Sequence, residues 1–178
     1  IKKLENVTNG MEIKSHDEIS CETCILAKQL NIRNKSSCNK ANNPLDVIYS
    51  DLAGPIDPVG KDGFKYVMNF VDEYSGCTFC YCLKQKSDSV KATEKFISDV
   101  APFGKIKFIR SDNGGEYISN DFNNLLIANK IKHIYTCPYS PHQNGVAERS
   151  WRTLFDMARA LLIESIFPKF LLPYAIYT

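Results

Sequence analysis

The chain has 178 residues, of which 44% are hydrophobic and 24% are charged, and its formal net charge is +2. This composition is typical of a folded globular protein and excludes a disordered, collagen-like or low-complexity chain. A charge so close to zero does not by itself indicate nucleic acid as a partner. We also expect no secretory signal and no membrane association, because no apolar run approaches the roughly 20 residues that span a bilayer.

Seven cysteines are present, which is an odd number. Without a secretory signal, an odd count favours reduced thiols over a disulfide framework and predicts a cytosolic or nuclear protein. Cys21 and Cys24 form a CxxC pair. Such a pair supplies only two of the four ligands that a structural zinc site requires, so alone it is a weak indication of zinc.

Regular patterns begin near Leu45, whereas residues 1–43 are polar and rich in Lys and Asn. Alternation of apolar and polar residues then predicts three successive strands, in the segments 45–55, 63–76 and 77–84. Short turns separate these segments, which is typical of a meander.

Beyond the third strand the spacing becomes helical. Val90, Phe96 and Val100 share one helical face, and Pro102 marks the end of that helix. Five strands with helices between the later ones predict an α/β fold in which a five-stranded sheet is covered by helices. The remaining segments are, in order, strand 105–115, helix 119–130, strand 131–139 and, in residues 140–162, a turn rich in Pro, Asn and Gly that leads into a long helix.

Three charged residues of the last helix lie on one side of it. Glu148, Arg152 and Arg159 fall within roughly 40° of one another at about 100° per residue. One interpretation is a surface pair between Glu148 and Arg152, which contributes roughly a few tenths of a kcal/mol. The other is a carboxylate held beside the sheet for chemistry. The charged residues border a predicted buried stripe of Trp151, Leu154, Phe155, Ala158, Leu161 and Leu162.

Two strand ends carry aspartates that could join Glu148. Asp51 lies near the end of the first predicted strand and Asp112 at the end of the fourth. If these strands are neighbours, both carboxylates lie at one edge of the sheet, below the helix that carries Glu148. Three converging carboxylates repel one another unless cations lie among them, and their oxygens suit Mg²⁺ or Mn²⁺. Two such ions about 3.5–4 Å apart can clamp the attacking and leaving oxygens of a phosphoryl transfer.

The sequence around these carboxylates resembles a known family. The motifs SDLAGP, VDEYSG, SDNGGEY and YSPHQNGVAERSWRTL, with CETCILAK upstream, are similar to the catalytic core of retroviral-type integrases. More narrowly, they resemble the integrases of copia-type LTR retrotransposons. The resemblance covers nearly the whole chain. It implies a ribonuclease-H-like fold with a mixed five-stranded sheet and a site for two Mg²⁺ or Mn²⁺ ions.

The resemblance also implies an activity. Asp51, Asp112 and Glu148 match the catalytic trio, in which Asp51 would share one ion with Asp112 and the other with Glu148. Such a polynucleotidyl transferase processes the 3′ ends of the element's DNA and joins them to target DNA. The implied partners are element ends, target DNA and further copies of the chain. The implied locations are the nucleus and cytoplasmic virus-like particles.

Candidate DNA contacts surround Glu148. Arg152 and Arg159 suit DNA phosphates, because a guanidinium group pairs with phosphate through two parallel hydrogen bonds. In the family a mobile loop lines the active site just before the helix, where this chain has Asn144 and Gly145. Ordinary turn chemistry explains these polar residues equally well. The further DNA-binding candidates are Tyr139, His142, Gln143 and Asn144.

The family pattern divides the chain into residues 1–43 and 44–178. Residues 1–43 resemble the end of a zinc-binding module in which two histidines precede two cysteines. Cys21 and Cys24 match the cysteines, but the histidine pair is missing, so we expect a truncated module with an incomplete site, for which Zn²⁺ is a candidate ligand in the full-length protein. His16 or Cys38 are the candidate substitute ligands. Residues 44–178 match a catalytic core that is truncated at its C-terminal end.

Two other functions fit the same residues. A ribonuclease H or another nuclease of this fold would use the same carboxylate chemistry. Ribonucleases H, however, typically take one carboxylate from a helix between the first two strand aspartates, and here the third carboxylate follows both, which favours an integrase. A domesticated, non-catalytic nucleic-acid-binding remnant would keep the fold without the reaction.

Overall fold

The computed structural model of the chain describes residues 41–136 and 141–177, without the side chains of residues 141–144. The described residues belong to one compact unit. Five strands build a single sheet in the order β3-β2-β1-β4-β5. The strands are β1 (Val47–Ala53), β2 (Tyr66–Asp72), β3 (Thr78–Leu83), β4 (Phe108–Ser111) and β5 (Lys132–Tyr135).

The sheet is mixed, which confirms the predicted fold class. Strands β1, β2 and β3 form an antiparallel meander, whereas β4 and β5 add to the other side of β1 in parallel. Parallel neighbours need a crossover connection, and helices provide it both before and after β4. The neighbouring strands β1 and β4 are the two that carry the predicted aspartates.

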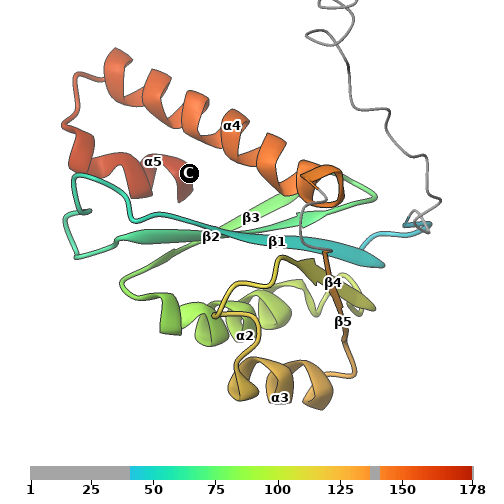
Figure 1. Cartoon of the computed structure of the whole chain (residues 1–178). Coiled ribbons are helices and arrows are strands. Elements are labelled where there is room, and N and C mark those ends of the chain that lie inside the picture. Colours follow the sequence, from blue (N-terminus) through green and yellow to red (C-terminus); the bar gives the residue numbers. More distant parts are fainter. Residues whose placement is uncertain (1–40, 137–140, 178) are drawn as a thin grey trace, which may run out of the picture. The chain divides into compact units, whose positions relative to one another are not determined.

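Helices cover both faces of the sheet (Figure 1). On one face lie α2 (Ser89–Val100) and α3 (Asn120–Ala128), and on the other lie α4 (Pro141–Glu164) and α5 (Leu172–Tyr177). Short 3-10 turns, η1 (Lys86–Asp88) and η2 (Lys169–Leu171), precede α2 and α5. Among the described residues, no helix is long and apolar enough to cross a membrane.

The main hydrophobic core lies between the sheet and the helices α2 and α3. Its centre is a stacked pair of aromatic rings from β2 and α2, Phe70 and Phe96, whose centroids are 4.1 Å apart. Both side chains are fully buried. The alternation that buries Phe70 on this face sends its neighbour Asn69 to the opposite face, beneath α4.

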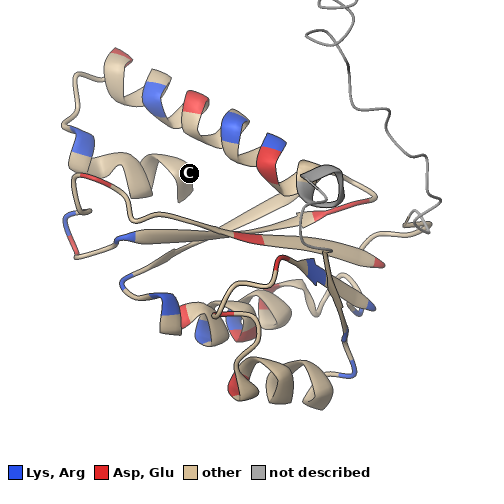
Figure 2. Ribbon diagram, viewed as in Figure 1, with Lys and Arg blue, Asp and Glu red and all other residues tan. Residues whose placement is uncertain are grey.

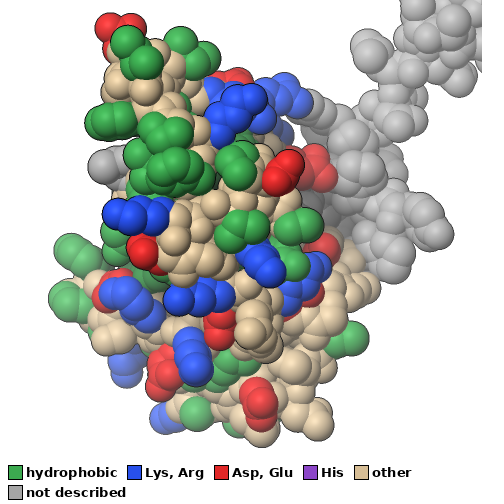
Figure 3. All heavy atoms as spheres, turned by 90° about the vertical axis from the view of Figure 1, so that its left-hand side faces the viewer, with side chains coloured by type: hydrophobic (Ala, Val, Ile, Leu, Met, Phe, Trp, Pro, Cys, Tyr) green, Lys and Arg blue, Asp and Glu red, His purple; other side chains and the backbone are tan. Residues whose placement is uncertain are grey.

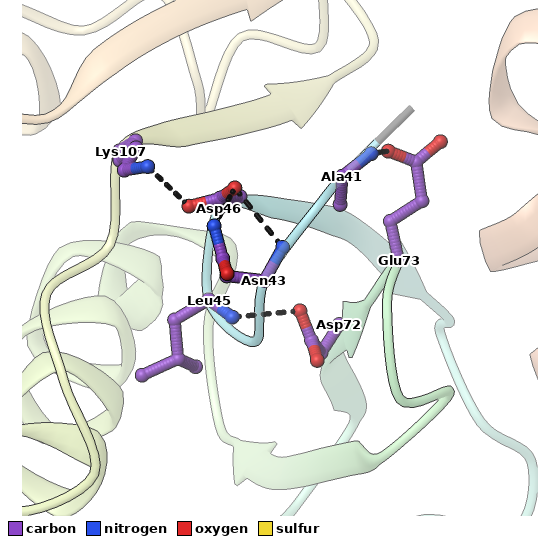
Figure 4. A network of polar contacts seen from close by, with 7 residues as sticks. All are labelled: Ala41, Asn43, Leu45, Asp46, Asp72, Glu73 and Lys107. Carbon is purple, nitrogen blue, oxygen red and sulfur yellow. Dashed lines mark hydrogen bonds and ion pairs between the residues drawn. The ribbon is translucent and has the colours of Figure 1, made fainter. Parts of the chain in front are cut away.

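A polar network at the start of β1 fixes the strand alignment (Figure 4). The backbone N–H of Leu45 donates to Oδ1 of Asp72 at the end of β2, over 3.0 Å. On the other side, Asp46 forms an ion pair with Lys107 at 2.6 Å, and its carbonyl oxygen accepts from the N–H of Phe108. These contacts join the start of β1 to β2 and β4, a few residues before Asp51.

Helix α4 differs from the prediction in where it begins and in the exposure of one residue. Its backbone is already helical from Pro141, so Asn144 and Gly145 lie inside the helix and not in a loop before it. Proline suits the first helical turn, because its fixed φ angle is helical and its missing N–H would have had no partner there. At the other end Leu161, predicted to be buried, is 50% exposed.

The exposure of Leu161 has a geometric reason. The C-terminal half of α4 packs against α5, and there Ala158 and Leu162 are the buried positions. Figure 3 shows hydrophobic side chains gathered on this side of the molecule. The exposed apolar residues at the end of α4 and just after it are Met157, Leu161, Ile163, Ile166 and Phe167.

Candidate active site

The two predicted aspartates come from neighbouring parallel strands, Asp51 from within β1 and Asp112 from just after the end of β4. Tyr49 of β1 pairs with Arg110 of β4 in the parallel ladder. Asp51 lies two residues further along β1, on the same face as Tyr49, and Asp112 lies two residues beyond Arg110, directly after the last residue of β4. Tyr49 packs there against Ala147 of α4. The expectation that the two strands are neighbours is therefore confirmed.

Asp51 is the most enclosed of the three carboxylates. Its Oδ1 accepts from the backbone N–H of Leu52 at 2.9 Å, and its Oδ2 accepts from the indole Nε1–H of Trp151 at 3.2 Å. Burial raises the pKa of Asp51, and the negative charges of Asp112 and Glu148 raise it further. Both other carboxylates therefore act electrostatically on Asp51, which indicates a locally negative site.

Asp112 follows β4 in a tight glycine turn. Its Oδ1 accepts from the backbone N–H of Gly114 at 3.0 Å. A Cβ atom on Gly114 would lie 3.0 Å from that same oxygen and 2.9 Å from Cδ of Glu116. Both neighbours are the ends of side chains, so a Cβ atom at position 114 would displace the carboxylates of Asp112 and Glu116 and leave the backbone of the turn in place. The motif DNGG is thus more than a generic turn signal.

Glu148 lies on α4, on the same side of the sheet as Asp51, and its side chain is exposed. In the part of the chain that the structure describes, it forms no ion pair, and no three His, Cys, Asp or Glu side chains come close enough to hold one metal ion. Asp112 is also exposed. Closing the trio around a cation therefore takes side-chain rotation of these two exposed residues.

The chemistry of this donor set fits a divalent metal. All three groups offer hard carboxylate oxygens, which Mg²⁺ and Mn²⁺ prefer. The raised pKa of Asp51 has the mutual repulsion of the carboxylates among its causes, and a cation between them would remove that repulsion. Each oxygen of Asp51 receives one hydrogen bond and keeps a lone pair for a metal.

Three residues beside the site were not predicted from the sequence. The carboxamide of Asn69 connects β1 to α4: its Oδ1 accepts from the N–H of Asp51, and its Nδ2 donates to Oγ of Ser150. Trp151 was predicted only as part of the apolar stripe, yet its indole N–H binds Asp51. One available signal was the amide at position 69, within the otherwise apolar run YVMNFV.

The two arginines differ in their surroundings. Arg159 forms an ion pair with Asp156 at 3.3 Å, and its guanidinium lies over the ring of Phe155 at 5.7 Å. Arg152 is exposed and pairs with no acidic group among the described residues, so the simple surface pair with Glu148 is not formed. Figure 2 shows acidic and basic residues interleaved along α4.

Several predicted residues cannot be placed in the site. Tyr139, Cys21, Cys24, His16 and Cys38 lie outside the described residues. His142, Gln143 and Asn144 belong to the first turn of α4 by their backbone, and their side chains are not described.

Comparison with protein families gives a match to the integrase core domain over residues 41–141, which is more than half of the chain. A similar protein is the retrovirus-related Pol polyprotein from transposon TNT 1-94 of Nicotiana tabacum, 34% identical over 94% of this chain and 12% of the polyprotein. The Pol polyproteins from transposons RE2 and RE1 of Arabidopsis thaliana are 33% and 32% identical over 90% and 97% of this chain. The chain spans only 11% and 12% of their lengths.

Solved structures confirm the ribonuclease-H-like fold. A chain of the simian T-cell lymphotropic virus intasome in complex with PP2A regulatory subunit B56 gamma matches with a TM-score of 0.64 and 23% identity, over 78% of this chain and 49% of that chain. The HTLV-2 integrase catalytic core domain in complex with magnesium, in its trimeric form, matches with a TM-score of 0.58 and 19% identity, over 77% and 85%. The similarity to copia-type elements is confirmed as well, and this chain belongs to the integrase core domain family.

Proposed function

We propose that the chain is the catalytic core of a retrotransposon integrase that processes DNA 3′ ends and joins them to target DNA. One observation carries this proposal: Asp51 lies on β1, Asp112 directly follows the neighbouring parallel strand β4, and α4, the helix that carries Glu148, packs on β1. The charges of both partners act on the carboxyl group of Asp51. A ribonuclease H is disfavoured, because the family match is to integrase cores.

In this proposal Asp51, Asp112 and Glu148 hold two Mg²⁺ or Mn²⁺ ions. Bound ions would polarise the scissile phosphate and stabilise the negative charge that develops on it. The carboxylate of Asp51 is held in one orientation, since each of its oxygens accepts a hydrogen bond. Asp112 and Glu148 are exposed and can rotate toward the ions when DNA arrives. No side-chain nucleophile is required.

The reaction has two displacements at phosphorus. In the first, a water oxygen forms a new bond to a phosphorus near the 3′ end of the element's DNA, and the bond to the 3′ oxygen breaks, which leaves a 3′-hydroxyl. In the second, this hydroxyl oxygen bonds to a phosphorus of the target DNA while the target's own bond to its 3′ oxygen breaks. The same carboxylates serve both steps, because negative charge develops on the oxygens of the attacked phosphate in the same way in each.

DNA is the proposed partner, both as element end and as target. Arg152 and Arg159 would contact phosphates from the exposed side of α4, together with Tyr139, His142, Gln143 and Asn144 near the start of the helix. We also propose that the chain acts as a homo-oligomer in the nucleus. The similar HTLV-2 integrase cores were solved in dimeric and trimeric forms, which supports the oligomer.

The test is Asp112→Asn, which removes a ligand charge with little change of shape. We expect Mg²⁺-dependent joining of labelled DNA ends to fall by about 100-fold or more, since the lost stabilisation amounts to several kcal/mol. The matched control is Asp121→Asn, the same exchange at an exposed position on α3. Joining at the unaltered rate in Asp112→Asn would refute the metal role. DNA binding without joining by the unaltered chain would instead indicate a non-catalytic binding module.

A further inference from the structure

Helix α4 is tied to β1 by directional contacts beside the proposed metal ligands. Most of the contact between this helix and the sheet is apolar, through residues such as Ala147 and Trp151. The burial of apolar surface is non-directional, whereas a hydrogen bond also constrains the angle between the groups that it joins. Hydrogen bonds at Asp51 add such a constraint between α4 and β1.

The first of these contacts runs through Asn69, whose side chain is fully buried. Its Oδ1 accepts from the backbone N–H of Asp51 at 3.1 Å, and its Nδ2 donates to Oγ of Ser150 at 2.7 Å. The hydroxyl of Ser150 in turn donates to the carbonyl oxygen of Ala147 at 2.7 Å. This hydroxyl has one hydrogen, which goes to Ala147, so it must be the acceptor for Asn69.

The second contact is the hydrogen bond from the indole Nε1–H of Trp151 to Oδ2 of Asp51, at 3.2 Å. The indole is only 8% exposed and packs in a hydrophobic cluster with Val67 and Ile176, which limits its movement. The contacts thus reach Asp51 from two sides: Asn69 holds its backbone and Trp151 holds its carboxylate. Both anchors on α4 lie within three residues of Glu148.

We propose that Asn69, Ser150 and Trp151 are positioning residues that set the distance and angle between the carboxylates of Asp51 and Glu148. This inference rests on the proposed function, because it gives those two carboxylates a shared metal. Residues that hydrogen-bond to a metal ligand, or fix the segment carrying it, commonly change metal affinity by about 10–100-fold when they are replaced. A rotation of α4 by a few degrees would move Glu148 while the fold stays intact.

The decisive variant is Ser150→Ala, which removes the acceptor for Asn69 while keeping a residue that favours helix. Ser150→Thr restores a hydroxyl and serves as the rescue. The matched control is Thr153→Ala, because Thr153 is one turn away and its hydroxyl donates only to a carbonyl oxygen of its own helix, that of Arg149. The control therefore loses the same kind of bond within α4 without losing the link to β1.

The readout is Mn²⁺ affinity, which needs neither DNA nor turnover. The chain contains a single tryptophan, Trp151, and it touches a proposed ligand, so quenching of its fluorescence by Mn²⁺ reports binding at this place. We expect Ser150→Ala to weaken Mn²⁺ binding about tenfold, Ser150→Thr to restore most of it, and Thr153→Ala to leave it unchanged. Trp151→Phe, measured by calorimetry because it lacks the indole, should also weaken binding.

A merely structural role predicts a different pattern. In that case Ser150→Ala would lower the melting temperature, since a buried amide loses its partner, while the folded variant would bind Mn²⁺ as tightly as the unaltered chain. That result, measured at a temperature where both proteins are folded, would overturn the inference. Failure of the proposed function is distinguishable: the unaltered chain would then show no saturable quenching, or quenching that Asp112→Asn does not reduce.

Discussion

The guanidinium of Arg159 lies 3.3 Å from the carboxylate of Asp156, one helical turn earlier on α4. Arg152, one turn from Glu148, pairs with no acidic group among the described residues. A DNA phosphate would therefore have to compete with Asp156 for Arg159, whereas Arg152 is open to it. The two arginines, equivalent on a helical wheel, are electrostatically different.

We predict that Arg152→Ala weakens DNA binding more than Arg159→Ala does. Each phosphate contact that is lost should lower the slope of log affinity against log salt by about one, with little dependence on DNA sequence. Titration of a labelled DNA end at several salt concentrations measures this slope. Lys91→Ala, on an exposed position of α2 at the opposite face, is the control. Equal slopes in all the proteins would mean that the arginines are only a solvated helix surface.

Gly114→Ala should impair the site and leave the fold largely intact. The added Cβ would lie 3.0 Å from the Oδ1 atom of Asp112, so this carboxylate would have to shift by a few tenths of an ångström. We expect Mn²⁺ affinity to fall by about tenfold, because changes that displace a metal ligand commonly lower metal affinity by that factor or more. Gly115→Ala is the adjacent control, since nothing lies within 4 Å of its added Cβ. Similar losses in the two variants would show that backbone stiffness, and not the carboxylate, is responsible.

His133 should make the protein less stable in mild acid. Burial lowers the pKa of His133 to about 4, below the value of 6.5 expected in an unfolded chain. Its Nε2 lies 2.9 Å from Oγ of Ser111, while its Nδ1 is buried without a partner among the described residues, so protonation finds no acceptor there. As the pH falls from 6.5 toward 4, His133 binds a proton in the unfolded chain but not in the folded chain, which lowers the free energy of unfolding.

The expected loss between pH 7.5 and pH 5.0 is about 1–2 kcal/mol of unfolding free energy from this group alone. Urea denaturation at the two pH values measures the total loss. The same measurement on His133→Gln removes the histidine contribution while keeping a side-chain N–H for Ser111. If the variant loses as much stability as the unaltered chain, carboxyl groups elsewhere cause the acid sensitivity.

The hydroxyl of Tyr49 links two charges of opposite sign. It accepts from Nη1 of Arg110 at 2.8 Å and donates to Oε1 of Glu73 at 3.0 Å. Arg110 is only 8% exposed, so a lost acceptor cannot easily be replaced by water. Tyr49→Phe should therefore destabilise the protein by about 1–3 kcal/mol in denaturant unfolding. Tyr74→Phe, at a position that is 56% exposed, should change stability little; equal effects would contradict this account.

The sequence by itself determined the order of the elements, the α/β class and the family. These follow from local information: the alternation in β1 and β2, the helical spacing from Val90 to Val100, and the motifs around Asp51, Asp112 and Glu148. Each signal is carried by residues close together in the chain. Side chains point to alternate faces of a strand and return to the same face of a helix about every 3.6 residues, so the spacing of apolar residues indicates the element. The proposed trio of carboxylates therefore follows from these motifs and the family that they resemble.

Only the tertiary structure decided how those residues are held. A helical wheel gives the angle of Leu161 but not the partner that α4 meets at that point, so its 50% exposure depended on where α5 packs. The same holds for Asn69 and Ser150, which are 81 positions apart and meet across the sheet and α4. Such a contact depends on strand register and helix rotation together, and neither is written in the pattern of one segment. The identity of the proposed ligands is local information, whereas the contacts that hold Asp51 depend on the packed fold.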